Sequence, residues 1–116
     1  MAAMEDIRTL TLALPEAEEK PHFDMPSFRV RNKIFATLHV KDNRAMIKLS
    51  LIDQSVFCKI DKNAIYPVPG TWGAGGATFF EWKKVKKAVL KDALTQAWLR
   101  IAPKKLAEEY IKQHLQ

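Results

Sequence analysis

Hydrophobic and polar residues alternate along the stretch from 27 to 50. A period of two is typical of β-strands that bury one face. It predicts three antiparallel strands joined by polar turns, with strands near 27–31, 34–40 and 45–50 and turns at 32–33 and 41–44. The side chains expected on the core face include Ile34, Ala36, Leu38, Ile47 and Leu49. Those expected on the opposite face are Arg29, Arg31, Phe35, Thr37, His39, Met46 and Lys48.

Helical spacing of apolar residues surrounds these strands. It predicts a short helix near 4–13 that ends before Pro15, and a final helix that begins after Pro103. The remaining expected elements are an irregular connection over 15–26, a helix near 51–60 capped by Ser50, an edge strand at 65–68, a strand at 77–82 and a helix from Lys87. Leu51, Val56 and Ile60 are expected to share one face of the helix that Ser50 caps. This order predicts an α+β domain with an antiparallel sheet of about five strands and helices packed on one face.

Length and composition predict a single domain over residues 1–116, since 47% of the residues are hydrophobic and no repeat is visible. The apolar runs are too short to cross a membrane, and the acidic first residues lack the basic and apolar regions of a signal peptide. The lone cysteine, Cys58, cannot form an internal disulfide. We therefore expect a cytoplasmic protein without membrane association, and a monomer in preference to an oligomer.

Charge is spread unevenly along the chain. The first 24 residues carry six acids and two basic residues, a net charge of −4. The whole chain has a net charge of +6, so the remaining residues carry +10. A basic body attracts nucleic acid or another anion, and a solvated lysine-rich surface is the alternative. The candidate phosphate contacts are Lys83, Lys84, Lys86 and Lys87 after the last strand, and Arg29, Arg31 and Lys48 on the open sheet face. On that face, basic residues interleaved with Phe35 resemble a platform for stacked bases.

Two further groups of residues are candidates for catalysis or ligand binding. His22 and Asp24 stand two residues apart, as in a histidine oriented by a carboxylate, yet no nucleophile or further metal ligand follows at a recognisable spacing. We therefore expect no enzyme activity, no metal and no cofactor. His22, Lys48 and Trp72 would together suit an anionic ligand with a planar or apolar part. The alternative is that Trp72, in a glycine-rich loop that is either mobile or closely approached, plugs the sheet edge.

Several segments resemble the MmcQ/YjbR family. In the first half these are Pro15-Glu16, His22, Phe28-Arg29-Val30, the run from Lys33 to Leu38, and Lys48-Leu49. In the second half they are Trp72-Gly73 and, most specifically, the run from Ala97 to Leu106. The resemblance implies a compact antiparallel sheet with helices packed on it, similar in architecture to frataxin. It also implies the DNA-binding role with which the family is commonly labelled, a label that rests on fold analogy.

We therefore expect a non-enzymatic protein that binds nucleic acid or another polyanion weakly and with little sequence specificity. The alternative function is a module that binds a small molecule or a protein in a groove near His22, Lys48 and Trp72.

Overall fold

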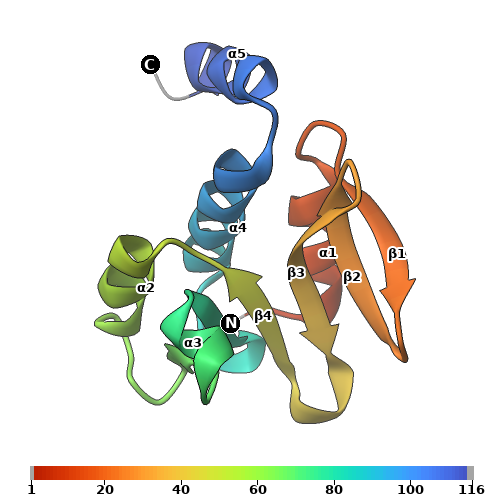
Figure 1. The fold of residues 1–116 in the computed structure, drawn as a ribbon. Helices are drawn as coiled ribbons and strands as arrows, with labels where there is room; N and C mark the ends of the chain where they lie inside the picture. Colours follow the sequence, from red (N-terminus) through yellow and green to blue (C-terminus); the bar gives the residue numbers. More distant parts are fainter. Residues whose placement is uncertain (1, 115–116) are drawn as a thin grey trace.

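The computed structural model describes residues 2–114, which contain one six-stranded sheet and five α-helices. The strands are β1 (Glu18–His22), β2 (Met25–Val30), β3 (Lys33–His39), β4 (Arg44–Lys48), β5 (Ile65–Pro67) and β6 (Ala77–Glu81). The helices are α1 (Met4–Leu12), α2 (Leu51–Cys58), α3 (Thr71–Ala74), α4 (Lys87–Ile101) and α5 (Lys104–His114). All neighbouring strands are antiparallel, in the order β1-β2-β3-β4-β6-β5. Figure 1 shows β1 to β4 of this sheet. The predicted α+β class is confirmed, with one strand more than expected.

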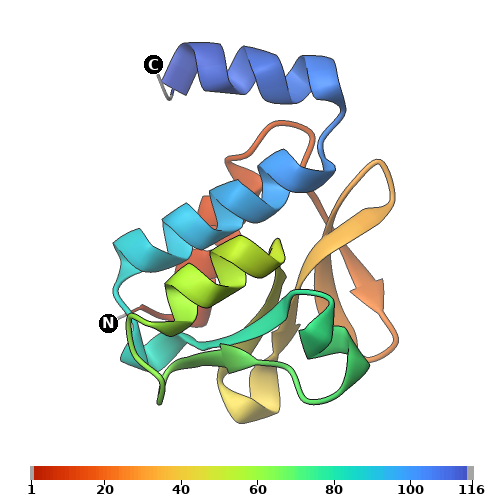
Figure 2. The ribbon, with the colours of Figure 1, turned by 60° about the vertical axis from the view of Figure 1, so that its left-hand side comes forward.

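Helices α1, α2 and α4 lie on one face of the sheet and leave the other face open (Figures 1 and 2). α4 packs on β3 and β4, α1 packs against α4, and α2 packs beside β5. α5 follows α4 after a break at Pro103 and extends across the end of α4 (Figure 2). None of the helices among residues 2–114 combines the length and the hydrophobicity that a membrane span requires.

The covered face of the sheet holds the main hydrophobic core. Phe28, Leu38 and Phe80 project from three different strands and are fully buried. Trp98 of α4 is buried with them, as predicted, and its indole nitrogen donates a 2.9 Å hydrogen bond to the carbonyl of Pro15. Because buried aromatic side chains contribute most to such cores, this layer holds the sheet and its open face in place.

A β-bulge in β3 reverses two predicted side-chain directions. Phe28 pairs with Ala36 and the next residue of β2, Arg29, pairs with Ile34, so Phe35 is the extra residue. Phe35 is fully buried in the main core, whereas Ile34 is partly exposed on the open face. The prediction for both residues is therefore wrong, because alternation assumes an uninterrupted ladder of paired residues.

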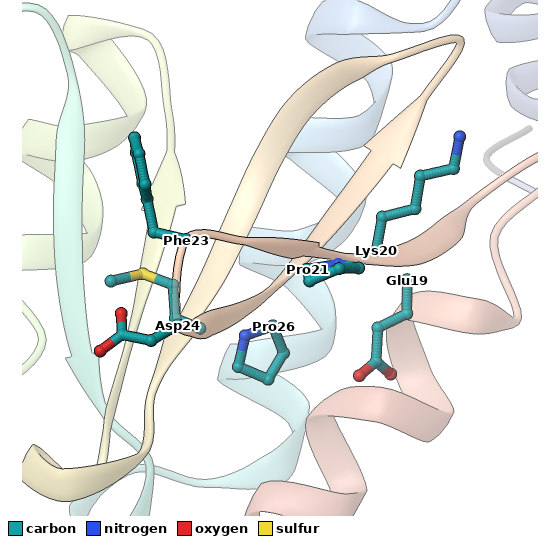
Figure 3. A pocket seen from close by; sticks show the side chains of 7 residues that line it. Glu19, Lys20, Pro21, Phe23, Asp24 and Pro26 are labelled. Atoms are coloured by element: carbon teal, nitrogen blue, oxygen red, sulfur yellow. The ribbon is translucent and has the colours of Figure 1, made fainter.

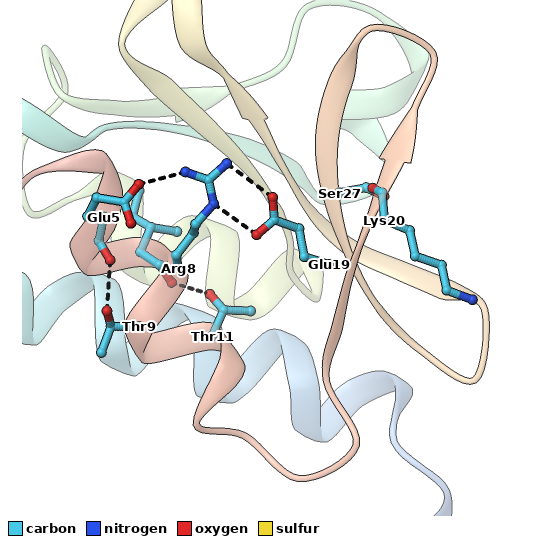
Figure 4. Close-up of polar contacts among 8 residues, drawn as sticks. Glu5, Arg8, Thr9, Thr11, Glu19, Lys20 and Ser27 are labelled. Carbon is cyan, nitrogen blue, oxygen red and sulfur yellow. Dashed lines mark hydrogen bonds and ion pairs between the residues drawn. The ribbon is translucent and has the colours of Figure 1, made fainter.

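The edge strand β1 occupies part of the 15–26 stretch that was expected to be irregular. Most of its residues are exposed, so no hydrophobic alternation marks it in the sequence. Pairing with β2 and a contact with α1 hold it in place: the Arg8 guanidinium donates to both carboxylate oxygens of Glu19, at 2.8 and 3.0 Å, and to Glu5 at 2.7 Å (Figure 4). The hydrogen bonds to Glu19 raise the pKa of Arg8 above its ordinary value.

Helix α2 begins where the sequence predicts. The Ser50 hydroxyl accepts a 3.1 Å hydrogen bond from the backbone N–H of Asp53, which is the predicted cap. The inward face carries Gln54 and Phe57. The face shared by Leu51, Val56 and Ile60 lies in solvent, with 58%, 55% and 54% of these residues exposed. The expected apolar face is therefore not the face of α2 that packs, and Ile60 lies beyond the end of the helix.

Candidate functional site

The open face of the sheet carries a cavity of about 310 Å³, which we call the open-face groove. Its floor comes from β3, β4 and β6, through Ile34, Thr37, His39, Met46 and Phe79. The tip of the β1–β2 hairpin and the segment that includes α3 also contribute to its lining. Met46 and Phe79 are almost fully buried in a small second cluster, so the floor is well packed.

His22, Lys48 and Trp72 all line the open-face groove. They come from the end of β1, the end of β4 and the helix α3. The Lys48 ammonium lies 5.9 Å from the centroid of the Trp72 ring, within the range of a cation–π interaction. Trp72 is 65% exposed, so it does not plug the sheet edge. The structure thus brings one cation, one imidazole and one indole to a single cavity.

The glycine-rich segment holds Trp72 through close backbone packing. A β-carbon on Gly73 would lie 1.7 Å from a backbone oxygen of the preceding segment. Gly76 has φ +110°, and a β-carbon there would lie 1.9 Å from the Leu49 carbonyl oxygen. The side-chain amide of Gln54 donates a 2.9 Å hydrogen bond to the Gly73 carbonyl from the inward face of α2. Of the two descriptions expected for this loop, the closely approached backbone is the one observed.

The tip of the β1–β2 hairpin contributes an aromatic residue that sequence reasoning missed. The turn consists of Phe23 and Asp24, and Phe23 has φ +59°. A positive φ at the first turn residue alone is typical of a type II′ turn, in which glycine is the usual residue there. Phe23 is nevertheless 90% exposed and projects from the hairpin tip (Figure 3). The exposure and the positive φ of Phe23 follow from its place in the hairpin turn, which the sequence did not predict.

The same hairpin separates the two members of the His22–Asp24 pair. His22 lines the open-face groove, whereas Asp24 lines a different cavity of about 420 Å³ formed by the hairpin itself (Figure 3). Within residues 2–114, no three side chains of His, Cys, Asp or Glu gather in a way that could hold a metal ion.

His39 adds a second imidazole to the groove. It lies 3.1 Å from the Thr37 hydroxyl and edge-on to the Phe79 ring, with 5.2 Å between ring centroids. Burial, and then the positive charge of Arg44, lower the pKa of His39 below its ordinary value. The groove therefore presents a neutral His39 at pH 7.

The basic residues predicted to contact nucleic acid occur in several ion pairs. Arg31 contacts Glu16 at 3.0 Å. The Lys84 ammonium lies 2.9 Å from a carboxylate oxygen of Glu81. Arg29 instead donates hydrogen bonds to Ser27 and to the Pro21 carbonyl at the edge of the sheet. A further pair joins Lys87 to Asp6 at 3.3 Å.

These basic residues also lie in separate places. Lys83, Lys84, Lys86 and Lys87 surround the start of α4. Arg31 lies near the other end of this helix, where it lines the same cavity as Arg100. A helix of 15 residues is about 20 Å long. Lys48 lies at the open-face groove, so the expected contacts form no single group.

The comparisons with known proteins agree with this fold. The family model described as YjbR matches residues 12–113, most of the 116-residue chain. The chain belongs to the YjbR family, which confirms the resemblance expected from its motifs. The crystal structure of protein DR2400 from Deinococcus radiodurans, described as a DUF419 domain, superposes with a TM-score of 0.75 at 18% identity. That match covers 97% of this chain and 88% of the other, and it shows a shared fold. No curated protein matches the chain.

Proposed function

We propose that this YjbR-family protein binds a small organic anion with a planar or apolar body in the open-face groove. One observation carries the proposal: Lys48, His22 and Trp72 converge on a single cavity, although they come from separate elements. A cavity of about 310 Å³ lies at the lower end of the size range of small-molecule sites. Its apolar floor favours a ring or hydrocarbon body, while Lys48 favours a carboxylate or a similar anionic group.

The two exposed aromatic residues support the proposal because folding does not explain them. Phe23 and Trp72 leave 90% and 65% of their surface in water. Burying an aromatic ring of this kind stabilises a protein by about 2 kcal/mol, most of which the free protein forgoes at Phe23 and part of which it forgoes at Trp72. Phe23 also occupies a backbone conformation that glycine would adopt more easily. A bound planar ligand would recover part of this burial.

We further propose that the groove binds and does not catalyse. Its lining offers no serine or cysteine as a nucleophile, and Asp24 lies outside it, so no carboxylate orients His22 there. His39, whose pKa is lowered by burial, is suited to act as a neutral hydrogen-bonding group.

Tryptophan fluorescence provides a direct test. Trp82 and Trp98 are 2% and 0% exposed, so Trp72 is the indole that a soluble quencher such as acrylamide reaches. We expect naphthoate and indole carboxylates to protect Trp72 from the quencher and to raise the melting temperature. Lys48→Met should weaken the binding of a carboxylate about tenfold and leave its neutral carboxamide analogue unaffected.

Matched variants make this test specific. Trp72→Phe keeps an aromatic ring and should retain binding measured by melting temperature, whereas Trp72→Ala should lose it. Lys86→Met removes the same charge at the start of α4 and should change nothing. If carboxylates shift the melting temperature equally in the parent and in Trp72→Ala, the open-face groove is not the binding site.

Single-stranded nucleic acid is the second candidate ligand. The observation that favours it is the combination of exposed Phe23 and Trp72 with Lys48, because bases stack on aromatic side chains beside cations. Fluorescence anisotropy with labelled single-stranded DNA tests it. Because Lys48 is the cation that lines the groove, we expect a slope near −0.7 in log K against log salt, and loss of binding in Trp72→Ala. Binding that persists in Trp72→Ala would place the DNA elsewhere.

A further inference from the structure

A second cavity, of about 500 Å³, lies between the β2–β3 turn and the junction of α4 with α5. Four basic side chains line it: Arg31, Lys33, Arg100 and Lys104. They come from the turn, the start of β3, the last turn of α4 and the start of α5. No carboxylate is among the residues that line the cavity. We call this group the basic junction. It lies apart from the lysines at the start of α4.

The turn that presents Arg31 is strained. Arg31 and Asn32 have φ values of +49° and +67°, and two consecutive positive values are typical of a type I′ turn. Asn32 suits such a turn, but asparagine, aspartate or glycine is also usual at the position that Arg31 occupies. Glu16, the ion-pair partner of Arg31, likewise has a positive φ of +59°. An exposed ion pair contributes little to stability, so folding alone does not explain an arginine here.

The other three cations have no comparable ion pair: within residues 2–114 the observed ion pairs leave out Lys33, Arg100 and Lys104. The position of Arg100 has an ordinary explanation, since a cation in the last turn of a helix is favourable. Lys104 has the opposite preference because it is the first residue of α5, where the helix dipole disfavours a cation. Like charges around one cavity repel one another, and an anion between them relieves that repulsion.

We propose that the basic junction binds a small molecule carrying a phosphate or diphosphate group. The planar guanidinium groups of Arg31 and Arg100 match the geometry of phosphate oxygens, and the lysines supply further charge. The cavity is large enough for a diphosphate with an organic substituent. This site is separate from the open-face groove and does not rest on the function proposed for it.

Inorganic pyrophosphate is the probe for calorimetric titration of the full chain, at constant ionic strength set with sodium chloride. We expect saturable binding of pyrophosphate that exceeds the binding of inorganic phosphate. Arg100→Gln and Lys104→Gln should each weaken it about fivefold or more, since each removes one charge from the cavity. Lys83→Gln and Lys86→Gln are matched controls near the start of α4 and should leave the dissociation constant unchanged.

Arg31→Asn separates a ligand-binding role from a structural one. Asparagine suits the type I′ turn, so we expect an unchanged or higher melting temperature together with about tenfold weaker pyrophosphate binding. A variant that keeps the parent's affinity would overturn the proposal. So would an equal loss of affinity in Lys83→Gln, which would indicate diffuse charge. Binding of labelled single-stranded DNA through these four residues, without pyrophosphate binding, would overturn the compact site in favour of a nucleic-acid surface.

Discussion

The two faces of the sheet differ in how completely their aromatic side chains are buried. On the covered face, Phe28, Phe35 and Phe80 are buried against helices until almost no apolar surface remains. On the open face, a smaller cluster packs around Met46 and Phe79, and the aromatic rings of Phe23 and Trp72 remain largely in water. Burial on one face suffices to hold an antiparallel sheet. The exposed aromatic residues and the cavity beside them are therefore available to bind a ligand.

The largest expected effect separates two tryptophans on the two faces. Trp98→Ala should reduce the free energy of unfolding by about 3–5 kcal/mol, because it leaves a cavity in the main core. It also removes the hydrogen bond from the indole to the Pro15 carbonyl. Trp72→Ala should change stability by less than about 1 kcal/mol, since that ring is mostly exposed. Urea denaturation measures both. Similar losses in the two variants would contradict the division between a structural and a free face.

The next effect concerns the turn that positions Trp72. Gly76→Ala combines a positive φ with a contact of 1.9 Å to the Leu49 carbonyl, and should cost about 1–3 kcal/mol or more. Gly75→Ala is the matched control: its added β-carbon would meet neighbours at 3.5 Å, an ordinary contact, and should alter stability by less than about 1 kcal/mol. If Gly76→Ala unfolds like the parent, the backbone of this segment is less tightly packed than the structure indicates.

A smaller effect of opposite sign is expected at the hairpin tip. Phe23→Gly should leave stability unchanged or raise it by up to about 1 kcal/mol, because glycine adopts the positive φ without steric cost. Phe28→Ala, a truncation of a fully buried phenylalanine, should cost about 3–5 kcal/mol. Thermal and urea unfolding compare the two. A clear loss of stability in Phe23→Gly would mean that the ring is structural and would weaken its assignment to ligand binding.

The smallest expected effect is the pH dependence of stability that His39 causes on the open face. His39 lies on the open face, where burial lowers its pKa below the ordinary value of 6.5. Above that value His39 is neutral in both the folded and the unfolded chain and does not affect stability. As the pH falls below it, the unfolded chain binds the proton first, so stability is lost. His39→Gln should therefore lose less stability than the parent between about pH 6.5 and 5. Parallel stability curves for the two proteins would contradict this assignment.

Local sequence patterns determined much of the architecture. Alternation located β2, β3 and β4, and helical spacing located α1, α4 and α5. The Ser50 cap was also readable, because a side-chain cap depends on residues only three positions apart. Short contiguous segments, most specifically the run from Ala97 to Leu106, likewise indicated the family to which the chain belongs. These features rest on interactions between near neighbours in the chain.

Other features depended on partners that sequence spacing does not reveal. β1 is almost wholly polar and exists because β2 and Arg8 hold it. The bulge that buries Phe35 is a matter of register between two strands. The direction in which α2 faces is associated with Gln54 reaching the glycine-rich segment.

The sites depend most strongly on tertiary structure. Sequence reasoning named His22, Lys48 and Trp72, but they are separated by 26 and 24 positions, and only the fold brings them to one cavity. It did not connect Arg31 with Arg100, which lie at a common cavity because the β2–β3 turn meets the end of α4. The candidate residues could be recognised from the sequence because the charge and ring type of a side chain depend on that residue alone. Their convergence at one cavity could not be recognised, because it results from strand order and helix packing, which join distant segments.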